Sequence, residues 1–229
     1  HMNLLGNTLE QIAIEKAGII KEKTPVLVGR KQKDTETVFE EKASQKNTSI
    51  LYPKQNKVKF NVPNYQKENI NTSISAIKIL DWKISNQQIN DGIENVNQNT
   101  GLRGRWETLS KNPKIICDTG HNVDGISNVI SQLKQIKFNK LHIVFGTVND
   151  KKTNDILNLL PKDAKYYFCK AKIDRALDAD KLKSIANEYK LIGESFESVE
   201  KALLNAKKNA KKEDLIFIGG STFVVAEVI

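Results

Sequence analysis

The chain has 229 residues, 39% hydrophobic and 28% charged, which is typical of a globular protein with one large domain or two modest ones. No run approaches the roughly 18–20 apolar residues of a membrane helix, and no secretory signal is visible at the start, so we expect a cytoplasmic protein without a membrane partner. The formal net charge is +9, but the lysines are scattered, which favours small anionic substrates over nucleic acid.

The first hundred residues predict helices joined to short strands. Thr8 can cap a helix with apolar residues at helical spacing, and Gly18 can end it. The predicted helices are 7–21, 34–47, 64–82 and a short one from 85, and the predicted strands are 24–29, 49–53 and 57–62. A polar, glycine-bearing stretch then indicates a domain boundary near residue 100, which divides the chain into 1–98 and 99–229.

Beyond this boundary, strands alternate with helices. The predicted strands are 113–119, 140–148, 164–171 and 214–229, the predicted helices are 122–135, 151–161, 178–190 and 198–211, and a short segment occupies 191–196. This alternation predicts an α/β domain with a doubly wound, mostly parallel sheet of the Rossmann type. In such sheets, ligands bind beyond the carboxyl ends of the strands.

The stretch Cys-Asp-Thr-Gly-His-Asn at 117–122 falls at such a strand end and contains one of only three histidines. Asp118 can hold a ribose hydroxyl, a metal-bound water or His121 itself, and Gly120 permits close backbone approach. The N–H groups at the start of the following helix offer an anion site. From position alone, a capping or packing role for His121 is equally open. Neither G-x-x-x-x-G-K-[ST] nor G-x-G-x-x-G occurs, so no complete nucleotide site is present by motif.

Six stretches, taken in order, together resemble one enzyme family. They are LLGNTLEQIAIEKAGIIK (4–21), YQKENINTSISAIKIL (65–80), GLRGRWETL (101–109), CDTGHN (117–122), FGTVNDKK (145–152) and GGSTFVVAEV (219–228). They are similar to segments of the folylpolyglutamate synthase/dihydrofolate synthase family, of the Mur ligase superfamily. The chain departs from the common pattern in small ways, with Gly-Leu-Arg-Gly-Arg for Pro-Gly-Arg and Trp106 where Phe is frequent.

The resemblance implies that the chain is the C-terminal half of a longer ligase. Residues 1–98 would be the end of the central ATPase domain, and 99–229 the C-terminal domain. The implied reaction adds L-glutamate to a folate or dihydropteroate, using ATP and Mg²⁺ and passing through an acyl phosphate. The implied protein is a cytoplasmic monomer. Because the family's phosphate loop is not among these residues, we expect the 229-residue chain alone to form no glutamate product.

The resemblance also implies metal and catalytic roles for the first segment. Lys16 matches a lysine that the family carries as a carbamate, which would supply oxygen ligands to Mg²⁺. His1 stands at the spacing of a second metal ligand, although His-Met is also what a cloning scar leaves. Without the resemblance, Lys16 reads as an ordinary solvent-facing lysine.

Further residues are implied to bind ATP. Asn69 matches an amide that contacts the adenine, and Arg105 matches an arginine on the phosphates, a task that suits a guanidinium fork. Asp118 matches a nucleotide-binding aspartate, and His121 a catalytic, phosphate-proximal histidine. Judged alone, Asn69 reads as a solvent-facing asparagine and Arg105 as a salt-bridge partner. Five other residues lie near the expected loops without an individual role: Arg103, Asp150, Lys151, Arg175 and Ser221.

A different class of function is left open. The chain could be a non-catalytic module that binds a nucleotide or a folate. A Rossmann-type oxidoreductase is disfavoured because no glycine-rich turn follows the first strand of the α/β half. Nucleic-acid binding would require a continuous basic face, which scattered lysines do not predict.

Overall fold

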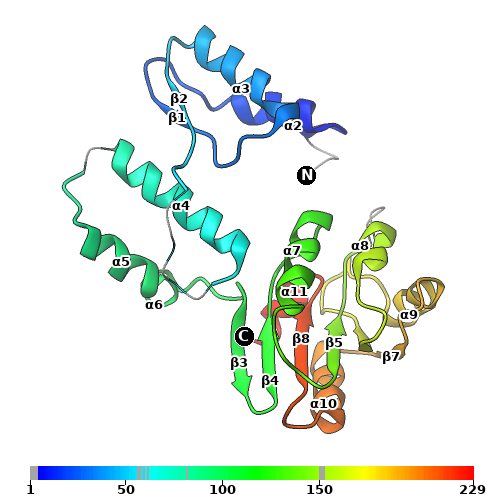
Figure 1. Cartoon of the computed structure of the whole chain (residues 1–229). Coiled ribbons are helices and arrows are strands. Elements are labelled where there is room, and N and C mark those ends of the chain that lie inside the picture. Colours follow the sequence, from blue (N-terminus) through cyan, green and yellow to red (C-terminus); the bar gives the residue numbers. More distant parts are fainter. Residues whose placement is uncertain (1–4, 56–57, 59, 61, 81, 150–152) are drawn as a thin grey trace. The chain divides into compact units, whose positions relative to one another are not determined.

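The computed structural model describes residues 5–55, 58, 60, 62–80, 82–149 and 153–229 (Figure 1). Three residues named above, His1, Asp150 and Lys151, lie outside this part of the chain. The chain divides into two compact units, His1–Asn95 and Val96–Ile229. No helix of the described residues is long and apolar enough to cross a bilayer.

The first unit consists of helices and one small parallel sheet. Its labelled helices are α2 (Leu9–Ala17), α3 (Lys33–Gln45), α4 (Asn64–Ile79) and α5 (Asn86–Glu94), and strands β1 (Val26–Leu27) and β2 (Ile50–Leu51) pair in parallel. The predicted capping of the first helix is confirmed, because Thr8 Oγ1 accepts the Gln11 N–H at 3.1 Å and Gly18 is the C-cap.

The strands of this unit are shorter than the sequence predicts. Segments 24–29 and 49–53 each contribute two residues to a sheet, and β1 is only half-buried. Residues 58, 60 and 62, which are the described part of the predicted strand 57–62, are not in a strand. Apolar residues indicate burial, but a strand also needs a neighbouring backbone, and β1 and β2 pair only with each other.

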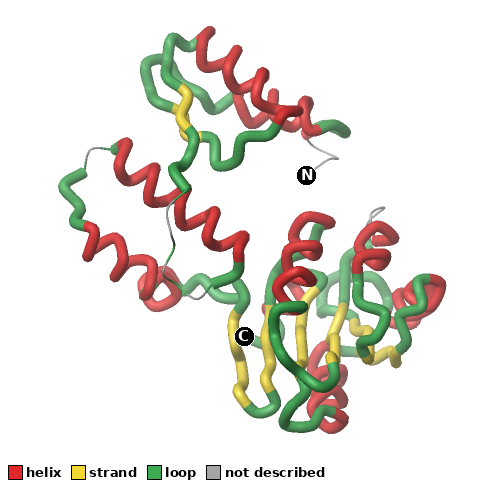
Figure 2. The backbone as a smooth tube through the Cα atoms, in the orientation of Figure 1, coloured by secondary structure: helices red, strands yellow, loops and turns green. Residues whose placement is uncertain are grey.

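The second unit is an α/β domain built on a six-stranded sheet (Figure 2). The strands are β3 (Glu107–Lys111), β4 (Lys114–Cys117), β5 (Leu141–Phe145), β6 (Lys165–Cys169), β7 (Gly193–Phe196) and β8 (Leu215–Gly219). The helices are α6 (Val96–Thr100), α7 (Val123–Leu133), α8 (Thr153–Leu159), α9 (Ala179–Glu188), α10 (Val199–Asn209) and α11 (Thr222–Ala226). The strand order is β3-β4-β8-β5-β6-β7, and every pair is parallel except β3–β4.

Helices cover both faces of this sheet, because successive strand residues point to opposite sides. Phe168 of β6 packs in the cluster formed with α7, α8 and α9, while its neighbour Tyr167 packs in the cluster formed with α10 and α11. The chain adds β5, β6 and β7 in turn and then returns through α10 to insert β8 between β4 and β5. The predicted doubly wound, mostly parallel sheet is therefore confirmed.

One strand of this unit was not predicted, and one predicted strand is wrong in its extent. The sequence analysis does not predict β3, whose residues are half-exposed because it is an antiparallel edge strand beside β4. The predicted strand 214–229 stops at Gly219, because Gly220 turns the backbone at φ +93° and Ser221 caps α11 by accepting the Phe223 N–H at 3.1 Å. The turn places Ser221 at the carboxyl edge of the sheet.

Candidate active site

Asp118 follows the carboxyl end of β4 and links two loops. Its N–H donates to the Ile218 carbonyl at 3.1 Å, which extends the pairing of β4 with β8. One carboxylate oxygen, Oδ1, accepts the Gly120 N–H, and the other, Oδ2, accepts the Trp106 N–H, both at 2.8 Å. The side chain is 2% exposed. Asp118 therefore holds the loop before β3 against the turn that leads into α7.

His121 is exposed at the amino end of α7. Its Nδ1 lies 3.0 Å from the Thr119 carbonyl oxygen, which only accepts hydrogen bonds, so Nδ1 carries the proton in the neutral ring and Nε2 is the basic atom. Asn122 caps the helix by accepting the Gly125 N–H at 2.7 Å. A Cβ at Gly120 would lie 3.2 Å from the Gly125 backbone, so the turn is tight. The ring stands at an accessible helix start and is not buried in the core.

Arg105 lies on a loop that is bound to the same turn. The residues on either side of it, Gly104 at φ +74° and Trp106 at φ +52°, both have left-handed backbone. The Gly104 carbonyl accepts the Thr119 N–H at 2.9 Å, and a Cβ at Gly104 would come within 2.9 Å of Thr119 Cγ2. With the Trp106–Asp118 bond, these contacts bring the backbone of Arg105 beside Asp118. Arg105 is exposed, so its guanidinium is accessible to a ligand.

Glu107, which the sequence analysis did not single out, closes this loop. Its Oε1 accepts from Arg103 Nε at 2.9 Å and from the second guanidinium nitrogen at 2.5 Å, and its Oε2 accepts the Gly104 N–H at 2.8 Å. Burial opposes ionisation of Glu107, but the bonds from Arg103 and Gly104 outweigh it and lower the carboxyl pKa. The sequence signal that could have identified Glu107 is an arginine four residues before it, on the other side of the Gly104–Arg105 pair.

The ends of β5 and β8 approach closely beside this region. The Gly146 N–H lies 3.4 Å from the Gly219 carbonyl, and a Cβ at Gly220 would lie 2.5 Å from Phe145 Cε2. Of the residues expected near these loops, Ser221 is buried as a helix cap, and the Arg175 guanidinium lies 4.8 Å from the centre of the Phe223 ring. Both residues thus have structural partners.

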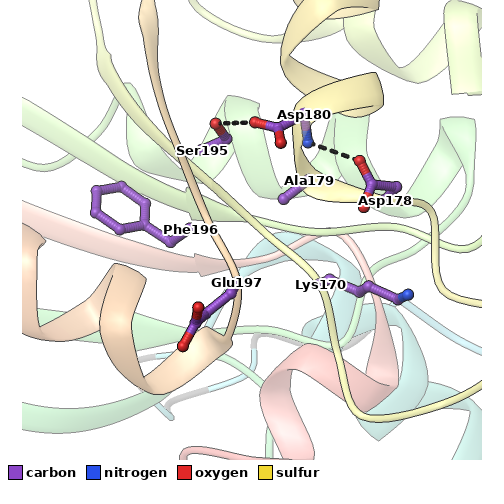
Figure 3. A pocket seen from close by; sticks show the side chains of 7 residues that line it. All are labelled: Lys170, Asp178, Ala179, Asp180, Ser195, Phe196 and Glu197. Carbon is purple, nitrogen blue, oxygen red and sulfur yellow. Dashed lines mark hydrogen bonds between the residues drawn. The ribbon is translucent and has the colours of Figure 1, made fainter.

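A separate pocket of about 220 Å³ opens at the ends of β6 and β7 (Figure 3). It is lined by Lys170, Asp178, Ala179, Asp180, Ser195, Phe196 and Glu197. Its carboxylates have partners: Asp178 caps α9, Asp180 accepts from Ser195 Oγ at 2.5 Å, and Glu197 pairs with Lys201. None of the residues predicted from the sequence lines this pocket.

The predicted residues of the first unit are exposed on two helices. Lys16 is in the last turn of α2, and Asn69 is on α4, where its carbonyl accepts from Ser73 Oγ at 2.9 Å. Among the described residues, no group of three or more His, Cys, Asp or Glu is placed to hold a metal ion. An unmodified lysine ammonium has no lone pair for Mg²⁺. The described side chains therefore do not form a metal centre, and no chemical step is assigned to one.

A buried polar cluster lies at the opposite, amino end of the sheet. His142 of β5 is 3% exposed, with Nδ1 at 3.0 Å from the Tyr167 hydroxyl and Nε2 at 3.3 Å from Asp214 Oδ2. Burial lowers the pKa of His142, and Asp214 opposes the shift only in part, while Lys140 and Lys165 add to it. His142 is accordingly neutral, donating from Nε2 to Asp214 and accepting the Tyr167 hydroxyl proton at Nδ1.

This cluster predicts an acid-sensitive stability. In the unfolded chain His142 regains its ordinary pKa of about 6.5, so the unfolded state binds more protons below that pH. The free energy of unfolding should therefore fall from pH 6.5 towards the lowered pKa of the folded state, by at most about 1.4 kcal/mol per pH unit for this proton. Urea titrations at pH 7.5, 6.5 and 5.5, which bracket the ordinary pKa of about 6.5, measure how steeply the free energy of unfolding changes with pH. His142→Gln should flatten it, and an equal slope in both proteins would contradict the assignment.

Comparison with known proteins places this geometry in a family context. Residues 104–222 match the family described as "Mur ligase, glutamate ligase domain". A Haloferax volcanii protein named probable bifunctional folylpolyglutamate synthase/dihydropteroate synthase is 30% identical over 166 residues, which cover 71% of this chain and 19% of the relative. The Escherichia coli dihydrofolate synthase/folylpolyglutamate synthase is 26% identical over 251 residues, covering all of this chain and 57% of the relative.

Solved structures agree in fold. Escherichia coli FolC in complex with DHPP and ADP superposes with a TM-score of 0.86 at 25% identity, over 100% of this chain and 57% of that one. The Yersinia pestis folylpolyglutamate synthase/dihydrofolate synthase complexed with AMPPNP and a Mn ion gives a TM-score of 0.83 at 24% identity, over 100% and 58%. The chain thus spans little more than half the length of these proteins.

Proposed function

The chain belongs to the Mur ligase family through its glutamate ligase domain, and we propose that it works as the C-terminal part of an ATP-dependent ligase that adds L-glutamate to a folate or dihydropteroate. The observation that carries this proposal is the arrangement of Arg105, Asp118 and His121 at one edge of the sheet, within the matched residues. The names of relatives that cover the whole chain support the substrate class.

The second unit supplies cationic side chains and hydrogen-bond donors that can bind anions. ATP and a substrate carboxylate repel each other, so their reaction depends on preorganised positive charge. Arg105 binds the nucleotide phosphates, and the exposed N–H groups at the start of α7 lie beside His121. The Nδ1 proton of His121 is directed to Thr119, so Nε2 is the atom that accepts a proton, and only the doubly protonated ring donates from Nε2 towards a phosphate oxygen. Asp118 acts mainly by positioning Trp106 and Gly120.

The substrates implied by this reaction are ATP, L-glutamate and the folate or dihydropteroate carboxylate. The carboxylate attacks the γ-phosphorus of ATP, which breaks the bond to the β–γ bridging oxygen, releases ADP and gives an acyl phosphate. The glutamate amine then attacks the acyl carbon, losing a proton, and inorganic phosphate leaves as the amide forms. Both steps develop negative charge on oxygen, which cationic groups at the sheet edge stabilise. The protein is proposed to be a cytoplasmic monomer that binds neither nucleic acid nor membrane.

The first unit is proposed to be the end of the ATPase domain, with Asn69 at the adenine. Mg²⁺ is proposed as the divalent cation that accompanies ATP, supported by the Mn ion named with the Yersinia pestis relative. A carbamate on Lys16, together with His1, would supply its ligands. Mass spectrometry of the intact chain, which detects the added CO₂ on Lys16, tests this modification directly.

Nucleotide binding tests the proposal. Isothermal titration of the chain with ADP and MgCl₂ should show saturable binding, and Arg105→Ala should weaken it by roughly tenfold to a hundredfold, because a charged hydrogen bond to phosphate is lost. Lys207→Ala on α10 removes an equal charge from an exposed site and should bind as wild type. Absence of saturable binding, or equal affinity in Arg105→Ala, would contradict the proposed role of this site.

A further inference from the structure

We propose that Glu107 is a positioning residue for Arg105, acting through a clasp formed by Arg103, Gly104 and Glu107. The inference rests on the proposed function, in which Arg105 binds phosphate. Glu107 sets the shape of the loop that carries Arg105 and does not itself contact the nucleotide.

The clasp is a closed set of three hydrogen bonds. One carboxylate oxygen of Glu107 accepts two bonds from Arg103, and the other accepts the Gly104 N–H. The Glu107 side chain is 17% exposed, so these bonds are partly shielded from water. The two bonds from Arg103 join oppositely charged groups, and such bonds are stronger than those between neutral groups. The clasp therefore fixes the loop on the amino side of Arg105.

The loop has a conformation that needs such support. Trp106 adopts φ +52°, which is unfavourable for a residue with a side chain and persists only where surrounding contacts impose it. Asp118 holds Trp106 on one side of Arg105, and Glu107 holds Gly104 on the other. Without Glu107, the Gly104 N–H loses its acceptor, and the bond that the Gly104 carbonyl accepts from the Thr119 N–H remains. The loop on the amino side of Arg105 is then held less firmly.

The clasp also separates the roles of two arginines. Arg103 and Arg105 are two residues apart, and a phosphate would attract both. Glu107 neutralises Arg103 and remains ionised at neutral pH, because the bonds from Arg103 and Gly104 outweigh burial and lower its pKa. The charge of Arg103 is thus already paired within the clasp, and the clasp fixes the backbone next to Arg105.

Amide exchange without any ligand gives the first readout. Glu107→Gln keeps the side-chain shape but removes the charge and one of the two acceptor oxygens. Hydrogen exchange measured by mass spectrometry should become at least roughly threefold faster in peptides covering 103–107, because local opening is easier. Glu200→Gln on α10 is the matched control and should leave this segment unchanged. Unchanged exchange in Glu107→Gln would overturn the proposal.

A double-mutant cycle with ADP and MgCl₂ gives the second readout. Glu107→Gln should weaken ADP binding by roughly threefold to tenfold in the wild-type background and have no effect in the Arg105→Ala background, because it acts through Arg105. An equal loss in both backgrounds would indicate a general structural role and overturn the proposal, as would unchanged or tighter binding. If Arg105→Ala itself binds like wild type, the proposed function fails, whereas the exchange result still decides whether Glu107 orders the loop.

Discussion

Replacing Gly220 with alanine is expected to destabilise the second unit by about 2–5 kcal/mol. Gly220 has φ +93°, where a side chain is strained, and an added Cβ would lie 2.5 Å from Phe145 Cε2 and 2.7 Å from the Gly146 carbonyl oxygen. Phe145 is fully buried in the core and cannot move aside without disturbing its neighbours. Urea unfolding followed by circular dichroism measures the loss.

Gly101→Ala is the matched control for this change. Gly101 also has positive φ, at +68°, but its added Cβ would meet no atom within 4 Å. Gly101→Ala should therefore lower the free energy of unfolding only through backbone strain, by about 1–2 kcal/mol. If Gly220→Ala lowers the free energy of unfolding by no more than Gly101→Ala does, then the close packing between the ends of β5 and β8 does not require a glycine at position 220.

Replacing Asp214 with alanine is expected to cost about 2–4 kcal/mol, because one buried and two partly buried donors lose their acceptor. Oδ1 accepts the Lys140 N–H at 3.1 Å, and Oδ2 accepts the Lys211 N–H at 2.8 Å and lies 3.3 Å from His142 Nε2. These bonds join the loops that precede β5 and β8. Burial opposes ionisation of Asp214, yet the Lys211 and His142 bonds lower its pKa, so its contribution is present above pH 3.8 and is lost in stronger acid.

Two further variants separate the hydrogen bonds of Asp214 from a general effect of mutation. Glu213→Ala removes an exposed carboxylate one residue earlier and should change the free energy of unfolding by less than about 0.5 kcal/mol. Asp214→Asn retains one acceptor oxygen and should fall between wild type and Asp214→Ala. A small effect of Asp214→Ala, comparable with that of Glu213→Ala, would show that water replaces the buried acceptor.

Local sequence signals identified most of the second unit. The helices that begin at Val123, Ala179 and Val199 each follow a side chain that accepts a backbone N–H, and such caps are readable as residue types. Strands β5, β6 and β8 are continuous buried runs, which is the pattern of a parallel sheet covered on both faces. Signals carried by neighbouring residues were therefore sufficient here.

The candidate site was only partly readable from the sequence. The Cys-Asp-Thr-Gly-His-Asn stretch lies at the carboxyl edge of the sheet, as predicted. Arg105 and His121 are exposed, and the loop of Arg105 is bonded to the turn before His121 through Gly104 and Thr119. The hydrogen bond from Trp106 to Asp118 joins residues 12 positions apart, which meet where β3 pairs with β4. The bonds of Glu107 to Arg103 and Gly104 are local, but they depend on the turn of the backbone between these residues. No periodic pattern reports such contacts.

By itself, the sequence determined the alternation of strands and helices, the capped helix starts and the segment where polar residues gather at a strand end, because each depends on residues within a few positions. Only the tertiary structure decided that β8 lies between β4 and β5, that the final strand stops at Gly219, and that the loop of Arg105 is held by Asp118 and Glu107. The strand order and the end of the final strand arise from packing between segments distant along the chain, and the loop of Arg105 arises from a backbone turn whose conformation no local residue pattern reports.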